Sequence, residues 1–223
     1  MMERKNIFPK ITDLSSAQEF VDRRLQYLKN TREEAGQVVL HFIPLEQKDE
    51  IPLINLLEDI RRKPVIHGRS RWIEHGLKIF EMESNKETAY AIYYFDGPVE
   101  IWNTTLLVDR HADRPPCIPS TAFEKDLIYS IDCILDLVRK DVIVIPALLV
   151  LSLLNVKGFE MATKDRWFRD RLAIENDDVI IANVIKNANE PPHAVLQYFF
   201  NRVWNACGYD SSKSYDAEGN WKP

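Results

Sequence analysis

The chain has 223 residues, of which 45% are hydrophobic and 28% are charged, and its formal net charge is −5. This composition excludes an intrinsically disordered chain, because apolar side chains are plentiful and the net charge is small. The acidic balance disfavours a free-standing nucleic-acid-binding protein, which usually carries a basic excess. Three separated cysteines without a C-x-x-C pair are typical of a reducing compartment, so we expect free thiols and a cytoplasmic location.

The first half of the sequence predicts two helices, a strand and an antiparallel meander. In chain order we expect a helix over 17–34, a strand over 38–43, a helix over 51–63, an irregular stretch around Gly68 and Gly76, and strands over 77–82, 88–95 and 99–102. Ser15 or Ser16 is expected to cap the first helix. Asp96-Gly97 is expected to form the turn between the last two strands, because glycine accepts a positive φ.

A polar, proline-rich connector over 108–119 divides the sequence into two halves, 1–107 and 120–223, which we expect to form one compact unit. Beyond the connector we expect a helix opened by a Thr121–Glu124 capping box, strands over 142–154, 159–163 and 179–185, and a last helix between Pro191-Pro192 and Gly208. The apolar run 142–154 is too short to span a membrane, because a spanning helix needs about 20 apolar residues.

The mixture of helices, strands and an antiparallel hairpin predicts an α+β protein. We expect a mixed, largely antiparallel sheet packed by several helices, followed by a structured C-terminal helix and tail.

A basic segment between residues 61 and 72 is the candidate nucleic-acid-binding site. Its members are Arg61, Arg62, Lys63, Arg69, Arg71 and Trp72, and no acidic residue falls between the first and the last arginine. Cations beside an aromatic ring are suited to hold phosphate and to stack a base. The alternative is a solvated helix end, where basic side chains favourably meet the helix dipole.

Two aromatic groups are candidate protein interfaces. Trp167 and Phe168 lie in a charged segment, and Trp204 and Trp221 belong to the C-terminal block. Large aromatic side chains are enriched where protein partners meet. The alternative for both groups is packing against the chain's own core, with the C-terminal tail folded back on the molecule.

Motifs for catalysis, metals and cofactors are missing from the sequence. It contains no phosphate-binding glycine loop, no nucleophile elbow and no H-E-x-x-H. Asp109, His111 and Asp113 alternate in the connector, but a metal site typically needs three or four converging ligands. We therefore assign no catalytic residue, no metal and no cofactor, and favour a protein that is not an enzyme.

The C-terminal block has the pattern W-N-A-C-G-Y-x-x-S-x-x-Y-D-A-E-G-N-W, beginning at Trp204. This pattern resembles the C-terminal end of bacterial proteins that carry a Schlafen-type Alba domain. Further similar segments are 40–45, 95–100, 118–124 and 151–159. In that family the Alba-type domain comes first and is associated with nucleic-acid or ATP binding. This chain is expected to lack it, so the resemblance transfers none of that domain's functional residues.

The resemblance and the missing motifs together predict a non-catalytic accessory or interaction protein. It would assemble with itself or with a protein partner, in a bacterial nucleic-acid-related or defence-like complex, without a membrane. Two alternatives remain open. One is direct nucleic-acid binding through the basic segment, and the other is a hydrolase or nuclease whose active-site residues are dispersed in the sequence.

Overall fold

A seven-stranded antiparallel sheet forms the centre of the computed structural model, which describes residues 11–31, 35–46, 53–108, 115–163 and 172–222, with backbone alone for 53–56. Its elements are α1 (Leu14–Thr31), β1 (Gln37–Pro44), α2 (Leu53–Arg62), β2 (Arg69–Ile73), β3 (Gly76–Glu83), β4 (Lys86–Tyr94), β5 (Val99–Asn103), β6 (Cys117–Pro119), α3 (Ser120–Arg139), β7 (Ala147–Leu154), β8 (Glu160–Ala162), β9 (Val179–Ile185) and α4 (Pro192–Ala206). The predicted α+β class is confirmed.

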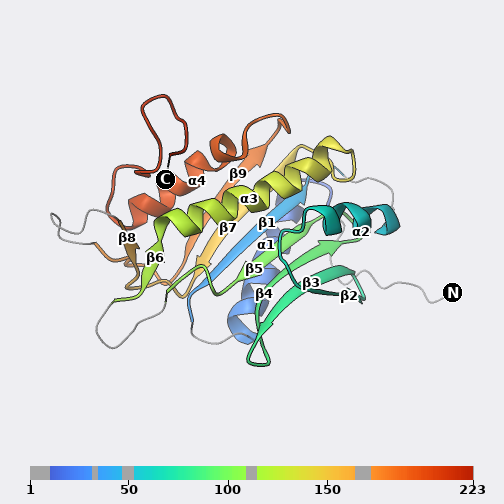
Figure 1. The fold of residues 1–223 in the computed structure, drawn as a ribbon, viewed down its shortest axis with the longest axis horizontal. Coiled ribbons are helices and arrows are strands. Elements are labelled where there is room, and N and C mark those ends of the chain that lie inside the picture. The colour runs from blue at the N-terminus through green and yellow to red at the C-terminus, as the bar shows by residue number, and fades with distance from the viewer. Residues whose placement is uncertain (1–10, 32–34, 47–52, 109–114, 164–171, 223) are drawn as a thin grey trace.

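The strand order of this sheet is β2-β3-β4-β5-β1-β7-β9, so β2 and β9 are its two edges (Figure 1). Strands β3, β4 and β5 form the predicted meander. β1 pairs with β7 along its whole length, which joins the two halves of the sequence in one sheet. β7 is buried on both faces, as a central strand must be, and this explains its uninterrupted apolar sequence.

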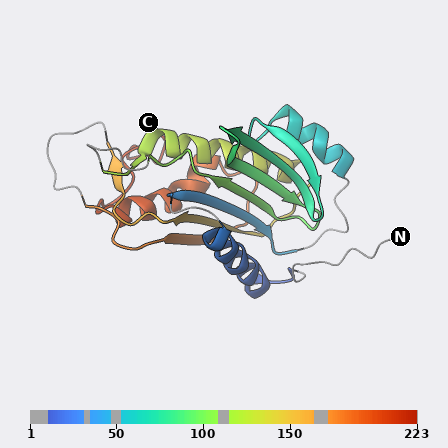
Figure 2. The same cartoon turned by 90° about the horizontal axis from the view of Figure 1, so that it is seen from below.

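Helices cover both faces of the sheet (Figure 2). On one face, Phe20, Val21 and Leu25 of α1 pack against β1 and β7, in a core cluster that also contains side chains of β4 and β5. The opposite face packs against α3 and α4. The small parallel pair β6–β8 lies outside the main sheet. None of the described helices is long and apolar enough to cross a bilayer.

The predicted irregular stretch around Gly68 and Gly76 is wrong, because it contains β2. The two glycines are needed there for close packing of the backbone. A Cβ atom at Gly68 would lie 2.2 Å from the carbonyl oxygen of Phe80, and one at Gly76 would lie 2.1 Å from that of Tyr93. Glycine inside a strand pattern marks such an approach as well as a loop.

The predictions for two helix caps are also wrong. Asp13 caps α1: its Oδ1 accepts a hydrogen bond from the N–H of Ser16 at 2.8 Å, and Ser16 Oγ accepts one from the N–H of Asp13 at 3.1 Å. Helix α3 has no side-chain cap, since Pro119 stands at its N-cap position. Glu124 is instead buried, where it binds the C-terminal tail.

The two expected glycine turns are confirmed. Gly97 has a φ of +109° and Gly208 a φ of +78°. The N–H of Gly97 donates to the carbonyl of Tyr94, and the N–H of Gly208 to that of Asn205, at the end of α4. Both positions require the left-handed backbone that glycine adopts without strain.

Candidate functional site

The edge strand β9 is the most distinctive surface feature of the molecule. Its sequence, V-I-I-A-N-V-I, is rich in β-branched residues and contains no charged residue. It pairs with β7 on one side, and no described strand pairs with its other side. A long, uncharged edge strand is a template for pairing with another chain unless it is covered.

The opposite edge of the sheet is built differently. β2 carries Arg69 and Arg71, and its first four residues are exposed. Charged side chains on an edge strand discourage pairing with other chains. Of the two edges, β9 is therefore the one whose composition favours pairing.

The direction of the backbone groups of β9 follows from the hydrogen-bond pattern of the sheet. The N–H of Leu45 donates to the carbonyl of Pro146 at 2.9 Å, which is a bonded pair just beyond the ends of β1 and β7 in the same register. Bonded and non-bonded pairs alternate along antiparallel strands, and a residue bonded on one side is not bonded on the other. The odd-numbered residues of β9 therefore bond to β7, and the even-numbered ones, Ile180, Ala182 and Val184, direct their N–H and C=O groups outward. The N–H of Val184 donates to Oδ1 of its neighbour Asn183 at 2.9 Å.

The same three residues present apolar side chains to the surface. Ile180 is 51% exposed, Ala182 is exposed and Val184 is half-buried. They lie on the face of the sheet that α1 covers, beside Ser152, Val150 and Leu148 of β7. Outward backbone groups and exposed apolar side chains thus coincide on one side of β9, an arrangement that suits the addition of another strand.

An open hollow of about 510 Å³ lies between β9 and α4 on the other face of the strand. Asn183 and Ile185 of β9 line it, together with Tyr198 of α4, which is 48% exposed. A strand added at β9 would border this hollow. An exposed tyrosine at such a position is typical of protein interfaces.

A buried ionic cluster fixes α1 against β1, β4 and β5, in the middle of the sheet. Glu100 is fully buried, and Arg24 of α1 donates to both of its carboxylate oxygens, each at 2.7 Å. His41 Nε2 lies 3.0 Å from Glu100 Oε2, and Tyr90 Oη donates to Oε1 at 2.7 Å. Farther along the helix, Lys29 forms an ion pair with Asp178, the residue before β9.

Burial alone would raise the pKa of Glu100, but hydrogen bonds from Arg24 and His41, together with the charge of Arg24, outweigh it. The pKa of Glu100 is held well below its usual range. The carboxylate therefore stays ionised and fully engaged. Glu100 and His41 are both inaccessible to solvent, so this cluster anchors α1 and is closed to a substrate.

A second cavity, of about 300 Å³, lies between the sheet and the first half of α3. Its floor is apolar and includes Leu40 and Ile101, while His67, Glu81 and Asp126 are among its polar lining. Among the residues that the structure describes, no hydrogen bond or ion pair joins these three side chains to one another. The cavity thus lacks a linked pair of catalytic groups.

The basic segment is divided by the fold. Lys63 is engaged by Asp132 of α3 at 2.6 Å, whereas Arg61 and Arg62 are on α2. Arg69 and Arg71 share one face of β2, because alternate residues of a strand point to the same side. Trp72 points to the opposite face, where its ring stacks on Phe95 with centroids 6.4 Å apart. The candidate residues thus occupy three different surfaces.

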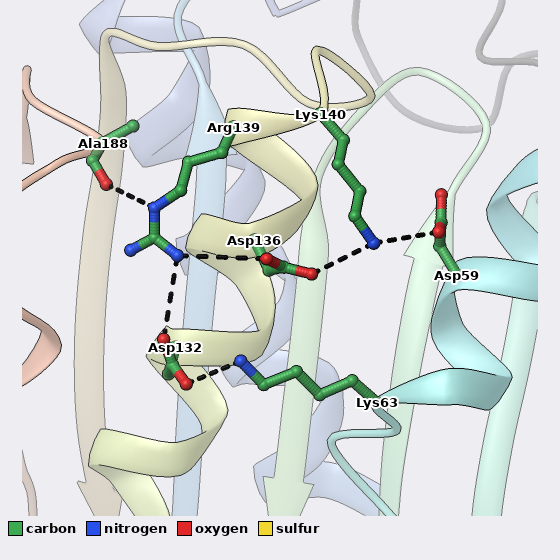
Figure 3. A network of polar contacts seen from close by, with 7 residues as sticks. All are labelled: Asp59, Lys63, Asp132, Asp136, Arg139, Lys140 and Ala188. Carbon is green, nitrogen blue, oxygen red and sulfur yellow. Dashed lines mark hydrogen bonds and ion pairs between the residues drawn. The ribbon is translucent and has the colours of Figure 1, made fainter.

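A network of ion pairs links the C-terminal ends of α2 and α3 (Figure 3). Lys140 lies 2.9 Å from Asp59 and 3.1 Å from Asp136. Arg139 contacts Asp132 and Asp136 more loosely and donates to the carbonyl of Ala188. Within the described part of the chain no group of three or more His, Cys, Asp or Glu side chains is placed to hold a metal ion.

The C-terminal tryptophans converge on Glu124. Trp204 Nε1 donates to its Oε1 at 2.8 Å, and Trp221 Nε1 donates to its Oε2 at 2.8 Å. Ser212 Oγ also donates to Oε1, at 2.7 Å. Trp204 is buried, and Trp221 is half-buried. The tail is thus folded back on α3 and α4 through one carboxylate.

Other candidate residues lie outside the described part of the chain. These are Trp167 and Phe168 of the second aromatic group, and Asp109, His111 and Asp113 of the connector.

The sequence alone does not single out Ile180, Ala182 and Val184. The signal available in it is an uncharged, β-branched run between Asp178 and Lys186. That run is equally typical of a buried strand, and the sheet order is needed to place it at an edge.

Comparison with known proteins identifies no relative of this chain. No family model matches the chain, and neither the curated proteins nor the solved structures contain a match.

Proposed function

We propose that this protein is a non-catalytic assembly subunit that joins another protein chain by strand addition at β9. The observation that carries the proposal is the coincidence, at Ile180, Ala182 and Val184, of outward-directed backbone groups with exposed apolar side chains. Backbone hydrogen bonds supply affinity in this mode of binding, and alternate side chains supply specificity.

The resemblance of the C-terminal block suggests the setting. A bacterial nucleic-acid-related or defence-like complex would use such a subunit to hold components together. In this proposal the block itself serves the fold, since Trp204 and Trp221 are bound to Glu124 of the same chain.

A charge placed on the edge tests the proposal. Ile180→Lys should abolish assembly, because a lysine in the apolar row would be desolvated when a strand is added. Met82→Lys is the matched control, since Met82 is a similarly exposed apolar residue, at 48%, on β3. The mass of the native complex in a gentle extract should fall for Ile180→Lys alone. Equal masses for the wild type and both variants would contradict the proposal.

Direct nucleic-acid binding remains a second candidate, and one observation favours a smaller site than the whole basic segment. Arg69 and Arg71 share a face of the exposed strand β2, and the guanidinium of Arg71 lies 5.1 Å from the centre of the Phe80 ring. Replacing both arginines by serine should weaken binding to single-stranded DNA and flatten its salt dependence. Unchanged binding in the double variant would exclude this site.

A further inference from the structure

We infer that the occupant of the β9 edge is a second copy of this chain, paired antiparallel about a twofold axis that passes between Ala182 and the partner's Ala182. This inference rests on the proposed function and names its partner. Most homo-oligomers are closed dimers with a twofold axis, in which one surface must be complementary to itself. Strand β9 meets that requirement in its backbone, its side chains and its flanking charges.

The backbone requirement is met because Ala182 directs its N–H and C=O outward. With the axis at this residue, Ala182 exchanges hydrogen bonds with the partner's Ala182. Ile180 exchanges them with the partner's Val184, and Val184 with the partner's Ile180. For this the N–H of Val184 exchanges its bond to Oδ1 of Asn183 for one to the partner. The two sheets then become one continuous sheet, and neither copy leaves its β9 edge unpaired.

The sequence of β9 is nearly symmetric about Ala182. About Ala182, Ile180 faces the partner's Val184, and Val179 faces the partner's Ile185. Asn183, opposite the partner's Ile181, is the polar exception. Because directly opposed side chains on one face are neighbours, the exposed apolar groups of one copy would cover those of the other.

The charged residues on either side of β9 favour this register over the two registers in which the axis is shifted by one residue. With the axis at Ala182, Asp178, which also pairs with Lys29 of its own chain, lies opposite the partner's exposed Lys186. Moving the axis to Ile181 would place Asp178 opposite the partner's Val184. Moving it to Asn183 would place Ile180 opposite the partner's Lys186. Both shifts set a charge against an apolar side chain, which disfavours them.

The first experiment measures the mass of the purified full chain by sedimentation equilibrium in reducing buffer. We expect the wild type and Met82→Lys to form dimers, and Ile180→Lys to have a dimer dissociation constant higher by at least about tenfold. Ala182→Pro should have the same effect, because it removes the N–H that would donate to the partner's Ala182. The fold of the single chain is spared, since this N–H makes no bond to β7. A wild type that stays monomeric, or an Ile180→Lys variant that stays dimeric, would overturn the inference.

The second experiment tests the register by cross-linking single cysteines in a Cys117→Ser chain, whose two remaining cysteines are buried. Opposed Cα atoms of a bonded antiparallel pair are about 5.5 Å apart, within the range that a disulfide spans. Ala182→Cys should therefore form a disulfide-linked dimer under mild oxidation. Ile180→Cys and Val184→Cys should cross-link when the two chains are mixed and not separately. Cross-linking of Asn183→Cys in place of Ala182→Cys would overturn the register.

The outcomes separate this inference from the proposed function. If the purified wild type is monomeric but Ile180→Lys loses a different protein from the native complex, the twofold pairing is wrong and strand addition at β9 stands. If Ile180→Lys changes neither the purified mass nor the native complex, both are wrong.

Discussion

Single residues in this protein show how a buried charge depends on the groups around it. Glu100 is enclosed by Arg24, His41 and Tyr90, which come from a helix and two different strands. Glu124 is equally buried but is held by the neutral donors Trp204, Ser212 and Trp221. Both carboxylates join segments that are far apart in sequence, the first α1 to the sheet and the second the tail to α3.

Glu100→Gln should destabilise the fold by about 3–5 kcal/mol, because it leaves the largely buried guanidinium of Arg24 without its counter-charge. Urea unfolding measures this change. Glu19→Gln is the control, because Glu19 forms an exposed ion pair with Arg23, and it should change stability by less than about 0.5 kcal/mol. Equal effects of the two substitutions would contradict the structural role given to Glu100.

The free energy of unfolding should also fall at acid pH, because Glu100 becomes protonated there. Its pKa is lower in the folded state than in the unfolded state, so the stability it contributes is present above the unfolded pKa. That stability is lost as the pH falls toward the folded pKa. Urea unfolding of the wild type at pH 7 and at successively lower pH should show this decline, and Glu100→Gln should show a smaller one. Parallel pH profiles would argue against the ionised cluster.

At the scale of elements, local pattern predicted most helices and strands, and tertiary contacts decided the exceptions. The period-two runs predicted the meander, and the apolar run predicted β7. The T-x-x-E pattern at Thr121–Glu124 suggested a capping box, but the buried tail competes for the carboxylate of Glu124. The glycines around β2 indicated a loop because the sequence does not show which backbone they approach.

The candidate site was less predictable than the fold for the same reason. The basic segment is continuous in sequence, but strand alternation and the ion pair of Lys63 with Asp132 distribute it over separate surfaces. The edge position of β9 depends on a sheet order that passes from β5 to β1 and then to β7. Such long-range order leaves no local mark in the sequence.

A pair of proline variants tests the direction of the β9 backbone. In an Ile180→Lys chain, Asn183→Pro should destabilise the fold by about 1–3 kcal/mol, because it removes the N–H that bonds to β7 and leaves a buried carbonyl of that strand without its donor. Ala182→Pro should cost clearly less, because its N–H points outward. Urea unfolding measures both. The reverse order would show that the outward residues of β9 are the odd-numbered ones.

The docking of the C-terminal tail is tested by Glu124→Gln. The amide nitrogen would meet indole and hydroxyl donors, and a buried unsatisfied donor costs about 1–3 kcal/mol. Unfolding by urea should show that loss, and limited proteolysis should cut the tail faster. Glu218→Gln, an exposed change in the same tail, should have neither effect. A tail that is equally protected in both variants would contradict the role of Glu124.

At the scale of the whole molecule, the two edge strands of the sheet differ in composition. β2 ends the sheet with exposed arginines, whereas β9 ends it with an uncharged row flanked by Asp178 and Lys186. α1 is tied to the start of β9 through Lys29, and α4 packs on the other face of that strand. The edge is thus held by helices on either face while its outer side stays open to another strand among the described residues.

The most direct test of assembly at β9 is the mass of the full chain in solution, measured by sedimentation equilibrium for the wild type and for Ile180→Lys. We expect a wild-type mass of about twice 26.0 kDa, and 26.0 kDa for the variant. A wild type of 26.0 kDa whose native complex is also unchanged by Ile180→Lys would contradict assembly at β9.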